Sequence, residues 1–191
     1  MNRLRLKNNK GFTLVELALV LVIVGLLITG VLKGEALIEN AKVKKLVNQK
    51  QSITAAYYTF FDRYGQLPGD EDIAGAPPTD TDEGDGDGII DAAERGLVFQ
   101  DLALAGIING SFSGAQTDVP NHAFGDFMDV RWIGNFGGAV VNSNCMWFDG
   151  VPAEIALQID TKYDDGVNNT GSIRANTVYT NAAPKQFVWR M

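Results

Sequence analysis

The chain has 191 residues, of which 46% are hydrophobic and 20% charged, and its formal net charge is −7. This length favours one domain with an appendage. Four of the 16 basic residues precede the first apolar run, so the rest of the chain carries 12 basic against 23 acidic residues. This excess of acidic residues argues against nucleic acid as a partner, because binding to phosphates needs a basic surface. Cys145 and His122 are each the only residue of their type, which excludes an intramolecular disulfide and leaves thiol–imidazole pairs and multi-histidine metal sites poorly supplied.

The N-terminal region is an apolar run from Phe12 to Leu32, interrupted by a single carboxylate at Glu16. A helix needs about 20 residues to cross the hydrocarbon core, so the run is long enough for a transmembrane anchor. The four basic residues before it would keep the N-terminus in the cytoplasm: Arg3, Arg5, Lys7 and Lys10. A secretory signal fits less well, because the run is too long, has no clear cleavage site and contains Glu16.

The junction of the leader with the apolar run carries a more specific pattern. The leader "MNRLRLKNNKG" ends at Gly11, and "FTLVE" follows with Glu16 at its end. This resembles the processing site of type IV pilins and type II secretion pseudopilins. The resemblance implies that prepilin peptidase removes residues 1–11, cutting after Gly11, and methylates the new N-terminal residue Phe12.

The same resemblance gives Glu16 a role. It implies that Glu16 of an incoming subunit neutralises the N-terminal amine of its neighbour while residues 12–34 pack into a membrane-embedded, then filamentous, helix core. Such pairing is favoured because both charges are otherwise stranded in a low dielectric. The alternative is a protonated or snorkelling glutamate in a simple anchor.

Residues 35–64 are predicted to continue the helix as an amphipathic half. The sequence has no proline until Pro68, and one helix face carries an apolar stripe. The stripe consists of Leu46, Ile53, Tyr57, Phe60 and Tyr64. It must pack against something further along the chain, and Gly65 is a plausible helix end.

Residues 65–191 are predicted to form a globular α+β head with long loops. The patterns favour a short helix over 92–108, strands over 127–134 and 139–148 separated by the turn "NFGG", and a helix over 153–163 opened by Pro152. Segments 172–179 and 186–191 complete a small antiparallel sheet. A long N-terminal helix packed on such a sheet is the pilin-like architecture, which rests partly on the resemblance.

The acidic stretch 79–94, "TDTDEGDGDGIIDAAE", can be overlaid on the calcium loop of EF-hands and dockerins over residues 83–94. Gly88 takes the sharp-turn position, and Ile90 is the apolar anchor. The predicted Ca²⁺ ligands are Glu83, Asp85, Asp87, the backbone carbonyl of Ile89, Asp91 and Glu94. Glu83 departs from the usual aspartate, so Asp82 or Asp80 are alternatives, and a solvated acidic loop is the competing interpretation. Several pseudopilins hold calcium in their heads, which favours the metal by analogy only.

Other polar features have plainer interpretations. The acidic turn 159–171 is predicted to be an ordinary turn, although Asp160 could join Asp164 and Asp165 around an ion. His122 is predicted to be structural or exposed, and Cys145 to be a buried small hydrophobe. The sequence offers no nucleophile–base pair, so an enzyme is not predicted.

The predicted function is therefore a non-enzymatic filament subunit, either a pilin or a pseudopilin. The partners that the resemblance implies are other pilin or pseudopilin subunits, prepilin peptidase and the inner-membrane assembly platform. The protein would span the bacterial inner membrane once, with its head in the periplasm, and then enter a filament in the periplasm or at the cell surface. The alternatives are a minor pilin that primes or caps the filament, and a membrane-anchored, calcium-stabilised binding or adhesion module.

Overall fold

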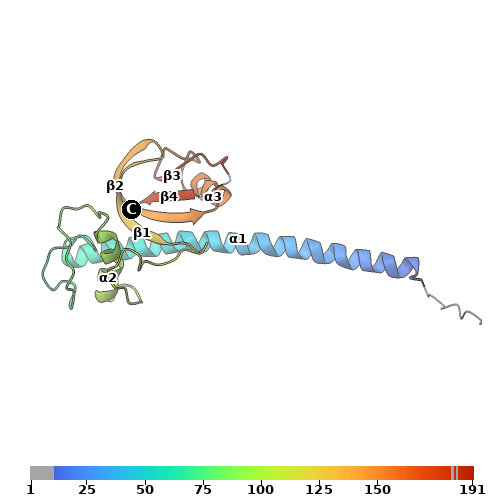
Figure 1. Ribbon diagram of the computed structural model, residues 1–191, viewed down its shortest axis with the longest axis horizontal. Coiled ribbons are helices and arrows are strands. Elements are labelled where there is room, and N and C mark those ends of the chain that lie inside the picture. Colours follow the sequence, from blue (N-terminus) through green and yellow to red (C-terminus); the bar gives the residue numbers. More distant parts are fainter. Residues whose placement is uncertain (1–10, 182, 184) are drawn as a thin grey trace, which may run out of the picture. The chain divides into compact units, whose positions relative to one another are not determined.

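The computed structural model describes residues 11–181, 183 and 185–191, and the chain divides into two compact units, residues 1–41 and 42–191. Helix α1 (Leu14–Tyr64) contributes to both units. The second unit adds seven elements, in chain order η1 (Glu94–Gly96), α2 (Leu97–Leu104), β1 (Met128–Phe136), β2 (Ala139–Val151), α3 (Ala153–Tyr163), β3 (Ile173–Ala175) and β4 (Lys185–Arg190). Figure 1 shows these elements along the chain.

The first unit is the N-terminal part of α1. None of the described residues 11–41 is buried, and every large apolar side chain of this segment faces outward. A helix that is apolar on all sides is stable only when lipid or other protein covers it. This part of α1 therefore has a surface made for a membrane or for packing against other chains.

The second half of α1 packs against the head and supplies part of the shared core. Leu46, Ile53, Tyr57 and Phe60 are buried, and Tyr64 packs against the same cluster from a half-buried position. The predicted apolar stripe is thus confirmed. Its residues recur at helical spacing, so they line one face of α1 and meet the sheet there.

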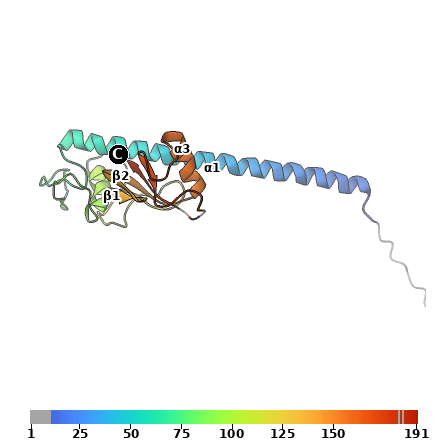
Figure 2. The same cartoon turned by 90° about the horizontal axis from the view of Figure 1, so that it is seen from above.

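The sheet has four antiparallel strands in the order β1-β2-β4-β3. Figure 2 shows β1 and β2 from a second direction. Strands β1 and β2 form a hairpin in which Phe136 pairs with Ala139. The two connecting residues, Gly137 and Gly138, have φ values of 60° and 82°. Two-residue hairpin turns require such positive φ angles, which glycine adopts without strain, so the turn predicted at "NFGG" is confirmed.

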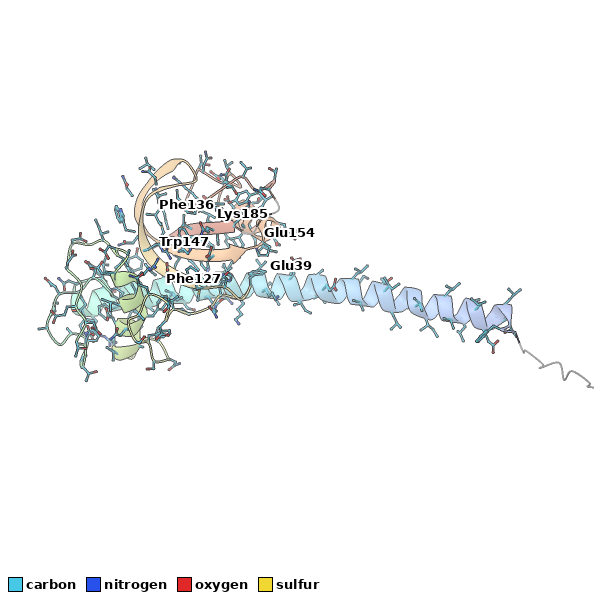
Figure 3. All side chains as sticks on the ribbon, in the orientation of Figure 1. Glu39, Phe127, Phe136, Trp147, Glu154 and Lys185 are labelled. Atoms are coloured by element: carbon cyan, nitrogen blue, oxygen red, sulfur yellow. The ribbon has the colours of Figure 1, made fainter. Side chains whose placement is uncertain are left out.

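Successive residues of β2 point to opposite faces of the sheet. Met146 and Phe148 pack into the core with α1, whereas Cys145 and Trp147 belong to a smaller cluster on the other face. On that face the rings of Phe136 and Trp147, both labelled in Figure 3, meet edge-on with centroids 5.2 Å apart. Cys145 is fully buried, as predicted, and burial raises the pKa of its thiol to about 11.

The pilin-like α+β fold is confirmed: a long apolar N-terminal helix is followed by a head with a four-stranded antiparallel sheet. Helix α3 has the predicted bounds. The helix predicted over 92–108 was too long, because η1 occupies its beginning and Gly106, at φ 68°, ends it shortly after Leu104. The strand predicted over 172–179 is reduced to Ile173–Ala175, and the one predicted over 139–148 extends to Val151.

Candidate functional site

The N-terminus of α1 is closed by a reciprocal pair of hydrogen bonds. The Thr13 backbone N–H donates to Glu16 Oε2 at 2.8 Å, and the Glu16 N–H donates to Thr13 Oγ1 at 3.2 Å. This is a capping box, in which two side chains satisfy N–H groups that the first helical turn leaves unpaired. Glu16 therefore also has a structural role within a single chain.

The residues flanking the predicted cut are accessible. Gly11 is exposed, with no atom of the described residues within 4 Å of the position a side chain would take. Phe12 is 86% exposed. The rest of the predicted leader lies outside the described residues. A bond between two accessible residues just ahead of a helix is well placed for a protease to bind.

Among the described residues, α1 is the one helix long and apolar enough to cross a membrane, judged by length and composition. Taken alone, that observation is weak, because signal sequences and buried core helices pass the same test. The match of the N-terminal sequence to a known family is more specific.

Residues 6–32 match the family model described as "Prokaryotic N-terminal methylation motif". The chain carries a prepilin-type methylation motif. The motif covers Gly11, Phe12 and Glu16, and together with the apolar helix and the sheet it is consistent with the type IV pilin and pseudopilin family. No curated protein and no solved structure shows a significant match to the chain. The methylation motif indicates that the protein is anchored in a membrane before any assembly.

The acidic loop of this prepilin-like chain is held by two carboxylates that accept backbone hydrogen bonds. Asp70 accepts from the N–H groups of Asp87 at 3.0 Å and Gly88 at 2.9 Å. Glu94 accepts from the N–H groups of Asp85 at 3.2 Å and Asp91 at 2.9 Å. Asp70 lies outside the predicted calcium loop, so a distant part of the chain completes it.

The structure brings together only part of the predicted ligand set. One carboxylate oxygen each of Asp85, Asp87 and Asp70 lies within 4.8 Å of the others. Glu83 and Asp91 are exposed and do not belong to this group. Asp91 Oδ1 instead accepts from the Ala93 and Glu94 N–H groups, which shapes the chain leading into η1.

The apolar anchor of the loop lies where the sequence predicts it. Ile90 is fully buried in the core of the head. Its N–H donates to Asn144 Oδ1 at 3.0 Å, and its carbonyl accepts from the Trp132 N–H at 2.7 Å. The Ile89 N–H donates to Asp87 Oδ1 at 2.7 Å. The loop is therefore fixed to both β1 and β2.

Burial raises the pKa of the Asp70 carboxyl, and the nearby charges of Asp87 and Asp85 raise it further, although its two backbone donors oppose the shift. Burial likewise raises the pKa of Glu94. Burial is the largest cause of both shifts and the charges of neighbouring acids add to it, so a bound cation would lower both pKa values. Asp70 could not have been found from the sequence, since "QLPGD" has the pattern of a plain turn and lies well before the loop.

The turn at 159–171 also gathers three carboxylates, those of Asp160, Asp164 and Asp165. Each carboxylate accepts hydrogen bonds from nearby groups. Asp160 accepts from Tyr179 and Gly166, and Asp164 accepts from Ile173. Asp165 accepts from Val167 and Thr170. These bonds account for the acidic residues as parts of an ordinary turn.

His122 is buried in the neutral form. The Phe124 N–H donates to its Nδ1 at 3.1 Å, so the ring proton is on Nε2, which lies 2.6 Å from the Asp149 carbonyl oxygen. Burial lowers the pKa of His122, and the charges of Asp126 and Asp149 compensate for only part of that shift. Protonation of Nδ1 would also break the bond from Phe124.

This assignment predicts a pH dependence of stability. A histidine whose folded pKa lies below its unfolded value, about 6.5, stabilises the protein above that pH, and the contribution is lost as the pH falls toward the folded pKa. We expect the melting temperature of the wild type to fall more than that of His122→Gln between about pH 7.5 and about pH 5. Equal losses in the two proteins would show that His122 does not titrate differently on folding.

Proposed function

We propose that the protein is a structural subunit, a pilin or pseudopilin, of a type IV pilus-like filament or a type II secretion pseudopilus. The observation that carries the proposal is the methylation motif over residues 6–32, which overlaps the N-terminal part of α1, where the large apolar side chains of the described residues are exposed. Lipid would cover this helix before assembly, and the helices of neighbouring subunits would cover it in the filament.

The proposal includes processing by prepilin peptidase on the cytoplasmic side of the inner membrane. Cleavage after Gly11 would leave Phe12 as a methylated N-terminal residue that still carries a positive charge. The basic leader keeps this end in the cytoplasm, so the head, residues 65–191, would lie in the periplasm before the subunit joins a filament.

Processing provides the first test. Protein isolated from membranes of the native bacterium should begin at N-methylated Phe12, whereas Gly11→Val should retain the whole leader, because a branched side chain would obstruct the approach of a protease to the backbone. Intact-mass spectrometry measures both. Asn8→Ala is the matched control, since it changes the leader without touching the cleaved bond. A wild-type protein that begins at Met1 would contradict the proposal.

Two related roles remain as alternatives. A minor pilin that primes or caps a filament would be processed in the same way but would be present in few copies per filament. A membrane-anchored binding or adhesion module would never polymerise, and the Glu16 variants discussed below separate it from a filament subunit. For a filament subunit or a minor pilin, the partners are other pilin subunits and the inner-membrane assembly platform.

Calcium binding by the loop 83–94 stays a prediction. Its support is the approach of Asp70, Asp85 and Asp87 and the raised pKa values of Asp70 and Glu94. In this arrangement Asp70 would take the place that the sequence pattern assigns to Glu83.

A further inference from the structure

Three carboxylates from separate parts of the head meet in its interior, apart from the cluster formed by Asp70, Asp85 and Asp87. Glu71 and Asp101 are 1% exposed and Asp80 is 8% exposed. Glu71 follows the turn after α1, Asp80 lies in the long connection before η1, and Asp101 is on α2. One oxygen of each lies within 4.8 Å of the other two.

Backbone N–H groups hold each carboxylate by one oxygen. Asp101 Oδ2 accepts from Gly69, and Glu71 Oε2 accepts from Ile73 at 3.1 Å. Asp80 Oδ1 accepts from Thr81 at 2.8 Å and from Asp82 at 3.3 Å. The three side chains are therefore oriented by the main chain and are not free to turn toward solvent.

The second oxygen of each carboxylate has no hydrogen-bond partner among the residues that the structure describes. Glu71 Oε1, Asp80 Oδ2 and Asp101 Oδ1 are all buried and receive no hydrogen bond. Unsatisfied acceptors are rare inside proteins, and each needs an explanation. Here three occur on residues whose carboxylates already lie close together, which is the arrangement expected when one further group satisfies all three.

Within the described part of the chain, no basic side chain forms a salt bridge with these three carboxylates. The one salt bridge found among residues 11–181, 183 and 185–191 joins Arg131 to Asp129, on β1. Burial and the neighbouring acids raise the pKa of Glu71 to about 8 and that of Asp101 to about 7. Without a positive partner, three carboxylates at this separation repel one another in a region of low dielectric.

We propose that Glu71, Asp80 and Asp101 bind a hard divalent cation, Ca²⁺ or Mg²⁺, in the interior of the head. The donors are all carboxylate oxygens, which these ions prefer. Asp80 is an alternative to Glu83 in the sequence prediction for loop 83–94, but the structure groups it with Glu71 and Asp101 and not with Asp70, Asp85 and Asp87, so the two sites are separate. Because the site is internal to one chain, the proposal does not depend on filament assembly.

The cation would serve as a cross-link. It would join the turn after α1 and the irregular segment that follows it to helix α2. The chain has one cysteine and forms no internal disulfide, so a bound ion would supply the constraint that a disulfide supplies elsewhere.

The test uses the whole chain in a non-ionic detergent, stripped with a chelator and titrated separately with CaCl₂ and MgCl₂. Isothermal titration calorimetry measures binding, and circular dichroism measures the melting temperature. We expect at least one of the two ions to bind and to raise the melting temperature. The ion that binds more tightly identifies the native ligand.

Neutral variants of similar shape locate the site. Loss of an outer-shell partner of a metal ligand costs about 10–100-fold in affinity, so Glu71→Gln and Asp101→Asn, which remove a ligand, should each cost at least about tenfold. Glu154→Gln removes an exposed carboxylate from α3 and should bind as the wild type does. Asp85→Asn should also leave this binding event intact, while abolishing any separate event at the loop.

Without metal, the same substitutions should not lower the melting temperature. Removing one of three repelling charges should leave metal-free Glu71→Gln and Asp101→Asn at least as stable as the metal-free wild type, and only their response to the cation should shrink. Failure of both ions to bind the wild type would overturn the proposal. Wild-type affinity for the cation in both Glu71→Gln and Asp101→Asn would also overturn it. So would an equal loss of stability in these variants with and without the ion, because the carboxylates would then have a purely structural role.

Discussion

Glu16→Ala should abolish filament assembly while leaving a processed, membrane-inserted protein with a folded head. In the proposed filament, Glu16 neutralises the N-terminal amine of an adjacent copy, and removal of one partner strands the other charge in a low dielectric. Breaking a buried ion pair in this way costs about 3–5 kcal/mol. The measurement is the amount of protein in sheared filaments relative to the membrane fraction.

The capping box complicates that experiment, because Glu16→Ala also removes the hydrogen bond from Thr13. Loss of a cap costs only about 1 kcal/mol, and α1 has 51 residues to compensate for it. Glu16→Gln separates the two roles, since glutamine serves equally in a capping box but carries no charge. We expect Gln to fail in assembly as Ala does.

The matched control is Glu35→Ala, which removes an exposed carboxylate from the same helix. Normal filaments from Glu16→Gln would show that capping is the whole function of the residue. Normal filaments from Glu16→Ala would favour an anchored module over a filament subunit.

Phe60→Ala should destabilise the head more than any other change considered so far. Phe60 is fully buried on α1 and packs against Tyr64 with ring centroids 4.5 Å apart. Truncating a buried phenylalanine to alanine costs about 3–5 kcal/mol, out of a total stability of about 5–15 kcal/mol. For a domain of this size the melting temperature should fall by roughly 10 °C.

The adjacent residue provides the control. Phe61 is 43% exposed and lies off the buried stripe, so Phe61→Ala should change stability by only about 0.5 kcal/mol. Thermal melts of both variants in detergent, followed by circular dichroism, give the comparison. Equal melting temperatures for the two variants would mean that α1 is not part of the core of the head.

The elements whose signals are local could be predicted from the sequence. Pro152 and the periodic residues after it specify α3, the two glycines of "NFGG" specify the hairpin, and the spacing of Leu46 through Phe60 specifies the buried face of α1. The helix after the acidic loop was predicted too long. The Ala93 and Glu94 N–H groups donate to Asp91 Oδ1, and these hydrogen bonds replace the first turn of the predicted helix.

The groups whose partners are distant in the chain could not be predicted. Asp70 meets residues 87 and 88 only after the turn following α1 has folded back on the loop. The association of Glu71, Asp80 and Asp101 depends in the same way on tertiary packing, and no spacing rule connects them. The sequence therefore located the acidic region of the head but did not identify the buried carboxylates within it.

The bond from the Trp132 N–H to the Ile90 carbonyl has a consequence for how copies of this protein meet. Strands β1 and β3 are the outer strands of the sheet, and open outer strands recruit other chains into unwanted aggregates. Here the acidic loop covers part of the outer edge of β1, and β3 is only three residues long. Two copies would thus have little exposed strand edge through which to pair. The apolar half of α1 is then the favoured surface for self-association.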